Sequence, residues 1–211
     1  MTTLSSALAT TPVVAILRAC SADRFPEVAD TLRQAGIRAV EFTLTTPGAL
    51  DALREYAHDL PGGLALGAGT VTTPREAEAA VAAGAEYLIT PATLPEVIAE
   101  AHRLDVPVLP GALTPTEVLT AWQSGASMVK LFPAFIGGPD YVRAVRAPLP
   151  DIPFVPTGGI GLEDAPAYLR AGATALGMGS PLVGDACEGG DLAALADRAA
   201  RLVDLVAGVP R

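Results

Sequence analysis

One lysine stands within an apolar, strand-like run of this sequence. The chain has 14 lysines and arginines together; 13 are arginines, so Lys130 is its only lysine. It lies in the run MVKLF over residues 128–132, where no other residue is polar. A guanidinium stays charged, whereas an amine can lose its proton and attack a carbonyl carbon. The type and the place of this residue therefore indicate a nucleophile that forms a Schiff base.

A glutamate occupies a similar place in a second apolar run. Glu41 lies in the run VEF, and side-chain alternation along a strand puts residues 39, 41 and 43 on one face. A charge inside an apolar strand is costly unless it is paired or neutralised. Two interpretations stay open. Glu41 and Lys130 form a structural ion pair, or Glu41 moves protons while Lys130 bonds to a ketone, a chemistry that needs no metal.

The elements that must position these groups are short apolar runs, rich in Val, Ile and Leu, that alternate with segments of helical period. We expect strands near 12–17, 37–43, 64–68, 86–90, 106–110, 127–132, 152–157 and 174–178. We expect helices near 23–34, 48–58, 74–83, 95–103, 115–123, 139–146, 162–170 and 191–207. Thr73 and Thr114, each followed by a proline, are expected to cap two of these helices.

A repeat in the chain favours a closed arrangement of these strands. Before the second, fourth, sixth and eighth strands a small residue and a glycine end the helix, at Gly36, Gly84, Gly125 and Gly172. Eight strand–helix pairs with this repeat predict an α/β fold, a (βα)8 TIM barrel that forms one catalytic domain over residues 1–211. A doubly wound open sheet has the same alternation and is the alternative.

In such barrels the active site lies at the carboxyl ends of the strands. Arg18 follows the first expected strand, Thr70 the third and Pro91 the fourth. Glycine-rich loops follow the seventh and eighth, with Gly158–Gly159 in PTGGI and Gly179–Ser180 in GMGSPL. Backbone N–H groups in such loops bind phosphate without a cationic side chain. We therefore expect an anionic, phosphorylated small molecule at this end.

Composition excludes several other classes of protein. The 211 residues are 50% hydrophobic and 18% charged, with a formal net charge of −9, so neither nucleic acid nor an anionic membrane surface is an expected partner. The start MTTLSSALAT lacks a basic segment before an apolar one, so we expect no signal peptide and a cytoplasmic location. Cys20 and Cys187 are expected to be free thiols, and His58 and His102 surface residues, so no metal centre is predicted.

The motifs, in their order along the chain, resemble one known family. The carriers are VVAILR, VEFTLTTPGAL, GAGTV, YLITP, LPGALTPTE, VKLFPA, FVPTGGI and GMGSPLV, spread over roughly residues 12–205. The sequence resembles the family of 2-keto-3-deoxy-6-phosphogluconate (KDPG) and 4-hydroxy-2-oxoglutarate (KHG) aldolases. The resemblance implies a class I aldolase, usually a homotrimer, that cleaves a phosphorylated 2-keto-3-deoxy sugar acid to pyruvate and glyceraldehyde 3-phosphate without a cofactor.

The resemblance also implies roles for individual residues. Lys130 corresponds to the Schiff-base lysine and Glu41 to the acid/base. The remaining roles are contact with the pyruvate carboxylate (Thr70), lining of the pocket (Pro91, Phe132) and phosphate binding (Gly158, Gly159, Ser180, with Thr157 beside them and Gly179 preceding the serine).

One position departs from part of the family. Some members carry an arginine four residues after the glutamate, where this chain has Thr45. Others, including phosphogalactonate aldolases, carry it in the ILR motif, which Arg18 matches. The choice among gluconate, galactonate and unphosphorylated KHG substrates therefore stays open. The same glycine-rich loops also suit a phosphate-binding isomerase or decarboxylase, or a non-catalytic barrel that senses a sugar phosphate.

Overall fold

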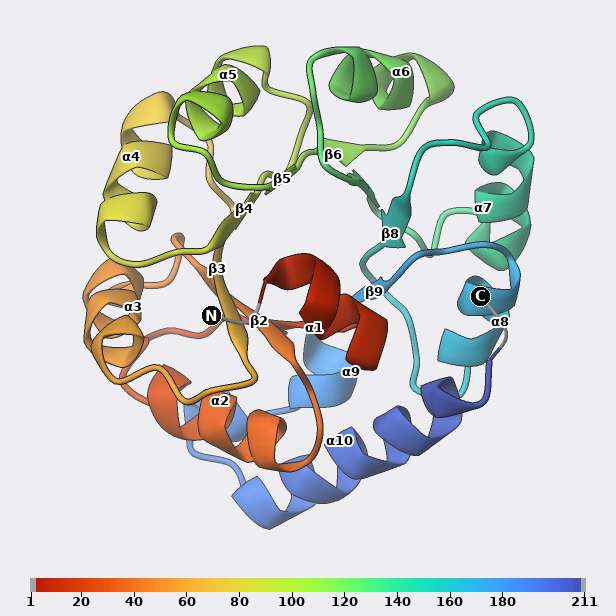
Figure 1. The fold of residues 1–211 in the computed structure, drawn as a ribbon. Coiled ribbons are helices and arrows are strands. Elements are labelled where there is room, and N and C mark those ends of the chain that lie inside the picture. Colours follow the sequence, from red (N-terminus) through yellow and green to blue (C-terminus); the bar gives the residue numbers. More distant parts are fainter. Residues whose placement is uncertain (1–2, 210–211) are drawn as a thin grey trace.

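In the computed structural model, which describes residues 3–209, helices surround a curved array of short parallel strands (Figure 1). The strands are β1 (Val13–Leu17), β2 (Ala39–Thr43), β3 (Ala65–Gly69), β4 (Tyr87–Ile89), β5 (Val108–Leu109), β6 (Gly111–Ala112), β7 (Val129–Leu131), β8 (Phe154–Pro156) and β9 (Leu176–Met178). The helices are α1 (Leu4–Thr10), α2 (Phe25–Gln34), α3 (Ala49–His58), α4 (Pro74–Ala82), α5 (Pro95–Arg103), α6 (Pro115–Gln123), α7 (Gly138–Arg146), α8 (Ala165–Arg170), α9 (Ser180–Val183) and α10 (Leu192–Ala207), with a 3-10 turn, η1 (Ala186–Glu188).

The strands pair in parallel in two sheets. A six-stranded sheet has the order β5-β4-β3-β2-β1-β9, and a three-stranded sheet has the order β6-β7-β8. A parallel bridge between Thr157 and Gly177 joins the end of β8 to β9. The α/β class is thus confirmed. The first strand pairs with the last, a neighbour relation that the doubly wound strand order does not contain.

The strand expected over 106–110 is observed as β5, and a further short strand, β6, follows it beyond the expected range. β5 and β6 lie on either side of Pro110, and β5 pairs with β4 whereas β6 pairs with β7. Proline has no N–H group to donate to a ladder, and only its carbonyl takes part, accepting from the Lys130 N–H at 2.9 Å. The proline is therefore the point at which the ladder changes partner.

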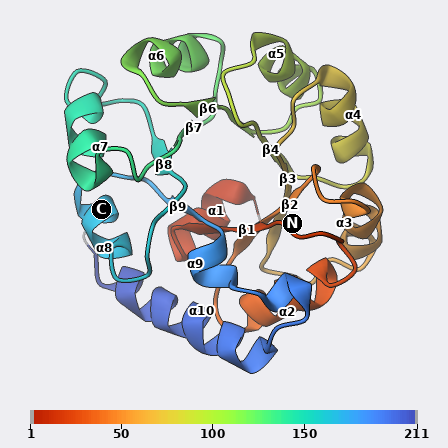
Figure 2. The same ribbon diagram turned by 180° about the vertical axis from the view of Figure 1, so that it is seen from behind.

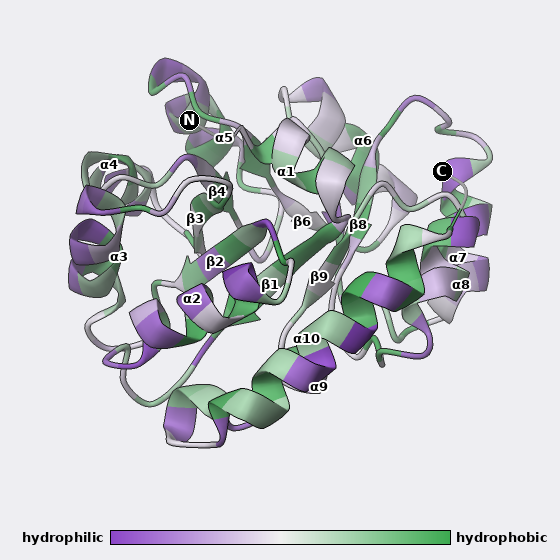
Figure 3. Ribbon diagram, turned by 60° about the horizontal axis from the view of Figure 1, so that its bottom comes forward, coloured by the Kyte–Doolittle hydropathy of each residue, from purple (hydrophilic) through white to green (hydrophobic). Residues whose placement is uncertain are grey.

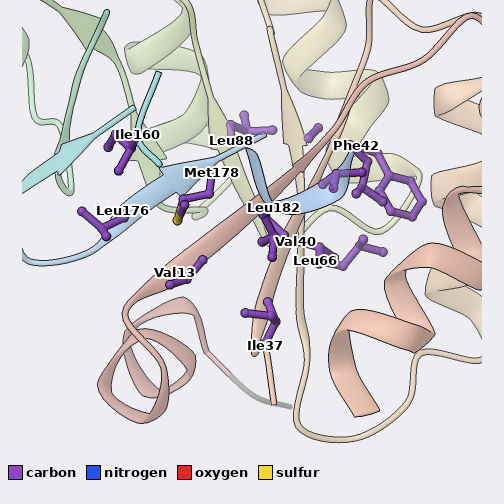
Figure 4. Close-up of a cluster of buried hydrophobic side chains, with 14 of the residues drawn as sticks. Val13, Ile37, Val40, Phe42, Leu66, Leu88, Ile160, Leu176, Met178 and Leu182 are labelled. Carbon is purple, nitrogen blue, oxygen red and sulfur yellow. The ribbon is translucent and has the colours of Figure 1, made fainter. Parts of the chain in front are cut away.

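The two faces of the strands carry different side chains. Alternate residues such as Val40, Leu66 and Met178 point outwards and pack against the surrounding helices (Figure 4). The residues between them point inwards, where Val14, Ala39 and other buried side chains form a separate cluster. Glu41 and Lys130 belong by alternation to the inner face, as expected from the sequence.

Helix α1 was not expected from the sequence. Thr3 caps it by accepting a hydrogen bond from the Ser6 N–H, and its buried residues Leu4, Ala7 and Leu8 pack onto the inner cluster of the strands. Figure 1 shows α1 lying across the centre of the ring of strands. The segment is too short and too rich in serine and threonine to predict a helix alone, so this packing stabilises it.

The expected helix ends are confirmed. Thr73 and Thr114 form capping boxes with a glutamate three residues later, and a proline begins each helix. The four repeat glycines all lie in the left-handed region, with φ between 98° and 103°. In α10 the buried residues recur every three or four positions, and its ribbon alternates between hydrophobic and hydrophilic segments (Figure 3).

Both cysteines are free, as expected. Over residues 3–209 no helix has the length and apolar character needed to cross a bilayer. Within the same range no three or more His, Cys, Asp or Glu side chains gather in a way that would hold a metal ion.

Candidate active site

A pocket of about 650 Å³ opens where the carboxyl ends of the strands meet. Figure 2 shows this side of the molecule, with α9 in front of β1. All of the predicted site residues line it: Arg18, Glu41, Thr70, Pro91, Lys130, Phe132, Thr157, Gly158, Gly159, Gly179 and Ser180. Residues from strands far apart in the chain are thus brought to one cavity.

Several lining residues were missed by the sequence reasoning, and one considered position lies elsewhere. Ile16, Pro181, Val183 and Gly184 also line the pocket. Ile16 pairs with Glu41 in the sheet, so the same alternation argument would have found it. Pro181 stood in the GMGSPL motif without a role. Thr45 is exposed and does not line the pocket.

The lysine and the glutamate that line the pocket are both buried. Lys130 is 7% exposed and Glu41 is 1% exposed. Lys130 stands between Gly111 and Val155 of the neighbouring strands. Its Nζ atom lies 5.3 Å from the centre of the Phe132 ring, within the range of a cation–π contact. The amine therefore faces the cavity and not the helix layer.

Glu41 has an unusual environment for a buried acid. Neither carboxyl oxygen has a hydrogen-bond partner in the protein, so a directly hydrogen-bonded Glu41–Lys130 pair is not formed. Burial raises the pKa of Glu41, while the positive charges of Lys130 and Arg18 act in the opposite direction. The carboxyl group thus interacts electrostatically with the amine, and no other protein group competes for its oxygens.

The raised pKa of Glu41 gives an expected stability effect. The folded protein binds this proton more tightly than the unfolded chain does. As pH rises above the pKa of the unfolded state, the unfolded chain loses the proton first, so the free energy of unfolding falls. Glutamine has no proton to lose. Thermal unfolding of Glu41→Gln against pH should therefore show a stabilisation that is small in acid and grows towards neutral pH. A Tm difference that shrinks with rising pH would contradict this.

Arg18 and Thr70 join the loops after β1 and β3. The Arg18 Nη2 donates a hydrogen bond to the Thr70 hydroxyl at 3.0 Å. Thr70 has φ of 59°, a left-handed conformation that is uncommon for a threonine. The contact leaves the guanidinium beside the pocket, where it adds positive charge to an acidic protein.

The glycine-rich loops pack closely on aromatic side chains. Gly158 and Gly159 have φ of 95° and 73°, where a side chain would be strained. A Cβ atom on Gly159 would lie 2.8 Å from the Cβ of Phe135, and one on Gly158 would lie 3.2 Å from the Phe132 ring. The Phe135 N–H donates to the Gly158 carbonyl at 3.2 Å. The loops after β7 and β8 therefore form one wall.

Comparison with known proteins assigns a class to this arrangement. The family described as KDPG and KHG aldolase matches residues 4–197. The 2-dehydro-3-deoxy-phosphogluconate aldolase of Pseudomonas aeruginosa is 42% identical over 159 residues, covering 75% of this chain and 70% of that protein.

Two solved structures are similar over almost the whole chain. One, of native KDPGal, has a TM-score of 0.88 at 31% identity and covers 94% of this chain and 95% of that one. The other, of the KDPG aldolase of Legionella pneumophila, holds pyruvate captured at low pH as a covalent carbinolamine intermediate. It has a TM-score of 0.84 at 29% identity, and covers 94% of this chain and 97% of that one. The protein is thus a lyase, a pyruvate-dependent aldolase. It belongs to the KDPG and KHG aldolase family.

Proposed function

We propose that this protein is a class I aldolase that cleaves KDPG to pyruvate and glyceraldehyde 3-phosphate through a Schiff base on Lys130. The observation that carries the proposal is the shared pocket of the only lysine and a buried carboxyl group without a hydrogen-bond partner. The carbinolamine captured in the Legionella relative supports the same chemistry. No metal or organic cofactor takes part in this scheme.

The reaction begins when the Lys130 amine attacks the C2 carbonyl of the keto-acid and forms a carbinolamine. Loss of water gives an iminium ion, which draws electrons from the neighbouring bonds. Removal of the proton from the C4 hydroxyl then breaks the C3–C4 bond. The aldehyde leaves, and the bonding pair remains as an enamine. Protonation at C3 and hydrolysis of the iminium release pyruvate and restore the amine.

Glu41 is the proton carrier in this scheme. The raised pKa of this buried carboxyl group suits it to both donate and accept a proton. It protonates the departing hydroxyl of the carbinolamine and takes the proton from the C4 hydroxyl, directly or through one water. Its oxygens have no protein partner that would compete for these steps.

The remaining pocket residues bind the two anionic ends of the substrate. Arg18 and Thr70, which line the pocket and are joined by a hydrogen bond, bind the pyruvate carboxylate in this proposal. The backbone and hydroxyl groups of Gly158–Gly159, with Thr157 beside them, and of Gly179–Ser180 hold the phosphate. Pro91 and Phe132 line the space between.

Trapping with borohydride tests the covalent step. Incubation with pyruvate and borohydride should reduce the iminium and leave a stable adduct, read as a mass gain on the peptide that contains Lys130. The other peptides contain no lysine and serve as an internal control. An unmodified protein at saturating pyruvate would overturn the proposal, and would favour an isomerase, a decarboxylase or a non-catalytic sensor.

Two further substrates are candidates for the same site. KHG, which would give pyruvate and glyoxylate, is in the family description, and one matched structure is named for KDPGal. Hydrogen bonds to a phosphate should raise kcat/KM for the phosphorylated acids over KHG on the order of 10- to 100-fold. A panel of the three substrates measures this ratio. The ratio of kcat/KM for the phosphorylated acids to that for KHG should fall in Ser180→Ala. An equal ratio in the variant and the wild type would show that the serine does not bind the phosphate.

The same proposal includes the assembly of the chain. The two sheets adjoin at two places. At one, only Pro110 separates β5 from β6, and at the other, the Thr157–Gly177 bridge joins the end of β8 to β9. Both features support one closed (βα)8 barrel built from the two sheets. On this basis residues 1–211 act as a single catalytic domain. A homotrimer in the cytoplasm rests on the family resemblance alone.

A further inference from the structure

The carboxyl group of Glu41 is held in place without a hydrogen bond from another protein group. Buried polar atoms are almost always paired, and an acid that moves protons is usually oriented by a hydrogen bond from a neighbour. Both oxygens of Glu41 lack such a partner. Packing contacts from β3 and β4 must therefore decide where this carboxyl group lies.

Gly69 provides the first contact. It lies on β3, beside β2, and a Cβ atom added there would stand 2.4 Å from Glu41 Oε1 and 2.7 Å from its Cδ. The carboxyl group thus lies directly on the bare backbone of Gly69. The φ of Gly69 is outside the left-handed region, so the backbone itself does not require glycine. Because glycine weakens a strand interior, its presence here has a reason in the carboxyl group.

Tyr87 provides the second contact. It pairs with Gly67 on β3, and its ring lies over that glycine, where an added Cβ atom would be 2.3 Å from the ring. The hydroxyl reaches across β3 and donates a hydrogen bond at 2.6 Å to the carbonyl of Val40, the residue before Glu41. Tyr87 is fully buried, so this bond fixes the β2 backbone from which the Glu41 side chain leaves.

We propose that Gly69 and Tyr87 are positioning residues for Glu41, which hold its carboxyl group by packing and by a backbone anchor, with neither oxygen engaged by another protein group. The proposal rests on the proposed role of Glu41. It also gives the glycines of the GAGTV motif and the tyrosine of YLITP a function that neither had in the sequence.

A double-mutant cycle measured by thermal unfolding tests the contact between Gly69 and the Glu41 carboxyl group independently of activity. Gly69→Ala alone should lower Tm by about 3 °C, because the added methyl group meets the carboxyl group. In the Glu41→Ala protein the same change meets no carboxyl group and should raise Tm by about 2 °C, as alanine replaces glycine in a strand. Equal Tm shifts for Gly69→Ala in the wild-type and Glu41→Ala proteins would show that Gly69 does not hold the carboxyl group.

Kinetics test whether the position of the Glu41 carboxyl group on Gly69 matters for turnover. Gly69→Ala should lower kcat on the order of 100-fold with KM within about threefold, since the acid is displaced while the binding groups remain. Gly62→Ala, where an added Cβ atom meets nothing within 4 Å, is the matched control and should behave as wild type. Unchanged kcat in Gly69→Ala overturns the positioning role while the proposed aldolase stands. A wild-type protein that neither cleaves nor traps overturns the proposed function instead.

Tyr87→Phe gives a second, milder variant. It keeps the ring over Gly67 and removes only the hydroxyl that anchors the Val40 carbonyl. We expect kcat to fall about tenfold, KM to be unchanged and the pH profile of kcat to shift, because the mean position of the Glu41 carboxyl group relaxes. If Tyr87→Phe lowers Tm but keeps the wild-type kcat and pH profile, Tyr87 has a structural role only.

Discussion

Lys130→Arg should abolish cleavage, with a loss in kcat/KM on the order of 10⁴-fold or more. Arginine keeps the positive charge on a slightly longer side chain, but its guanidinium does not lose a proton and cannot form the carbinolamine. The variant should also give no borohydride adduct with pyruvate. Activity is measured by coupling pyruvate release to a second enzyme, and trapping by mass spectrometry.

Two controls separate chemistry from folding in this experiment. The far-ultraviolet spectrum and Tm of Lys130→Arg should stay near those of wild type, because Lys130 lies at a pocket and not in the packed outer layer. Arg54→Lys places a second lysine on the surface of α3 and should be neither trapped nor impaired, since an exposed ammonium stays protonated. Cleavage by Lys130→Arg at the wild-type rate would show that the reaction does not pass through this amine.

Glu41→Gln should lower kcat about 10³-fold and change KM little. Glutamine has the size and polarity of the protonated acid, so the pocket keeps its shape, but the side chain can neither donate nor accept the proton that moves during dehydration and cleavage. Pyruvate should still be trapped on Lys130, at a lower rate. Single-turnover and steady-state kinetics with KDPG measure both effects.

The pH dependence identifies the group further. In wild type the limb of the kcat profile that reports this acid should lie above the ordinary range of a glutamate, because burial raises the pKa of Glu41. That limb should disappear in Glu41→Gln. A variant with wild-type kcat would remove Glu41 from the mechanism. A raised KM with unchanged kcat would assign it to binding instead.

Much of the site was predictable because chain order and strand alternation determine which side chains meet. Glu41 and Lys130 are polar residues in apolar strands, and both were placed on the inner face by a period of two. Arg18 and Thr70 directly follow strands and Pro91 lies two residues after one, and the carboxyl ends of parallel strands lie at one edge. Local sequence therefore determined most of the pocket lining, together with the helix caps at Thr73 and Thr114.

Other features depend on contacts between distant segments and have no local signal. Helix α1 is stabilised by packing on the inner cluster, and the strands on either side of Pro110 pair with different neighbours. The packing of Glu41 on Gly69, with Tyr87 reaching over β3 to Val40, joins three strands. The sequence by itself thus determined most of the residues that line the pocket, including its lysine and its acid. Only the tertiary structure decided that Glu41 lies there without a hydrogen bond from the protein, because that depends on which backbone atoms its side chain meets.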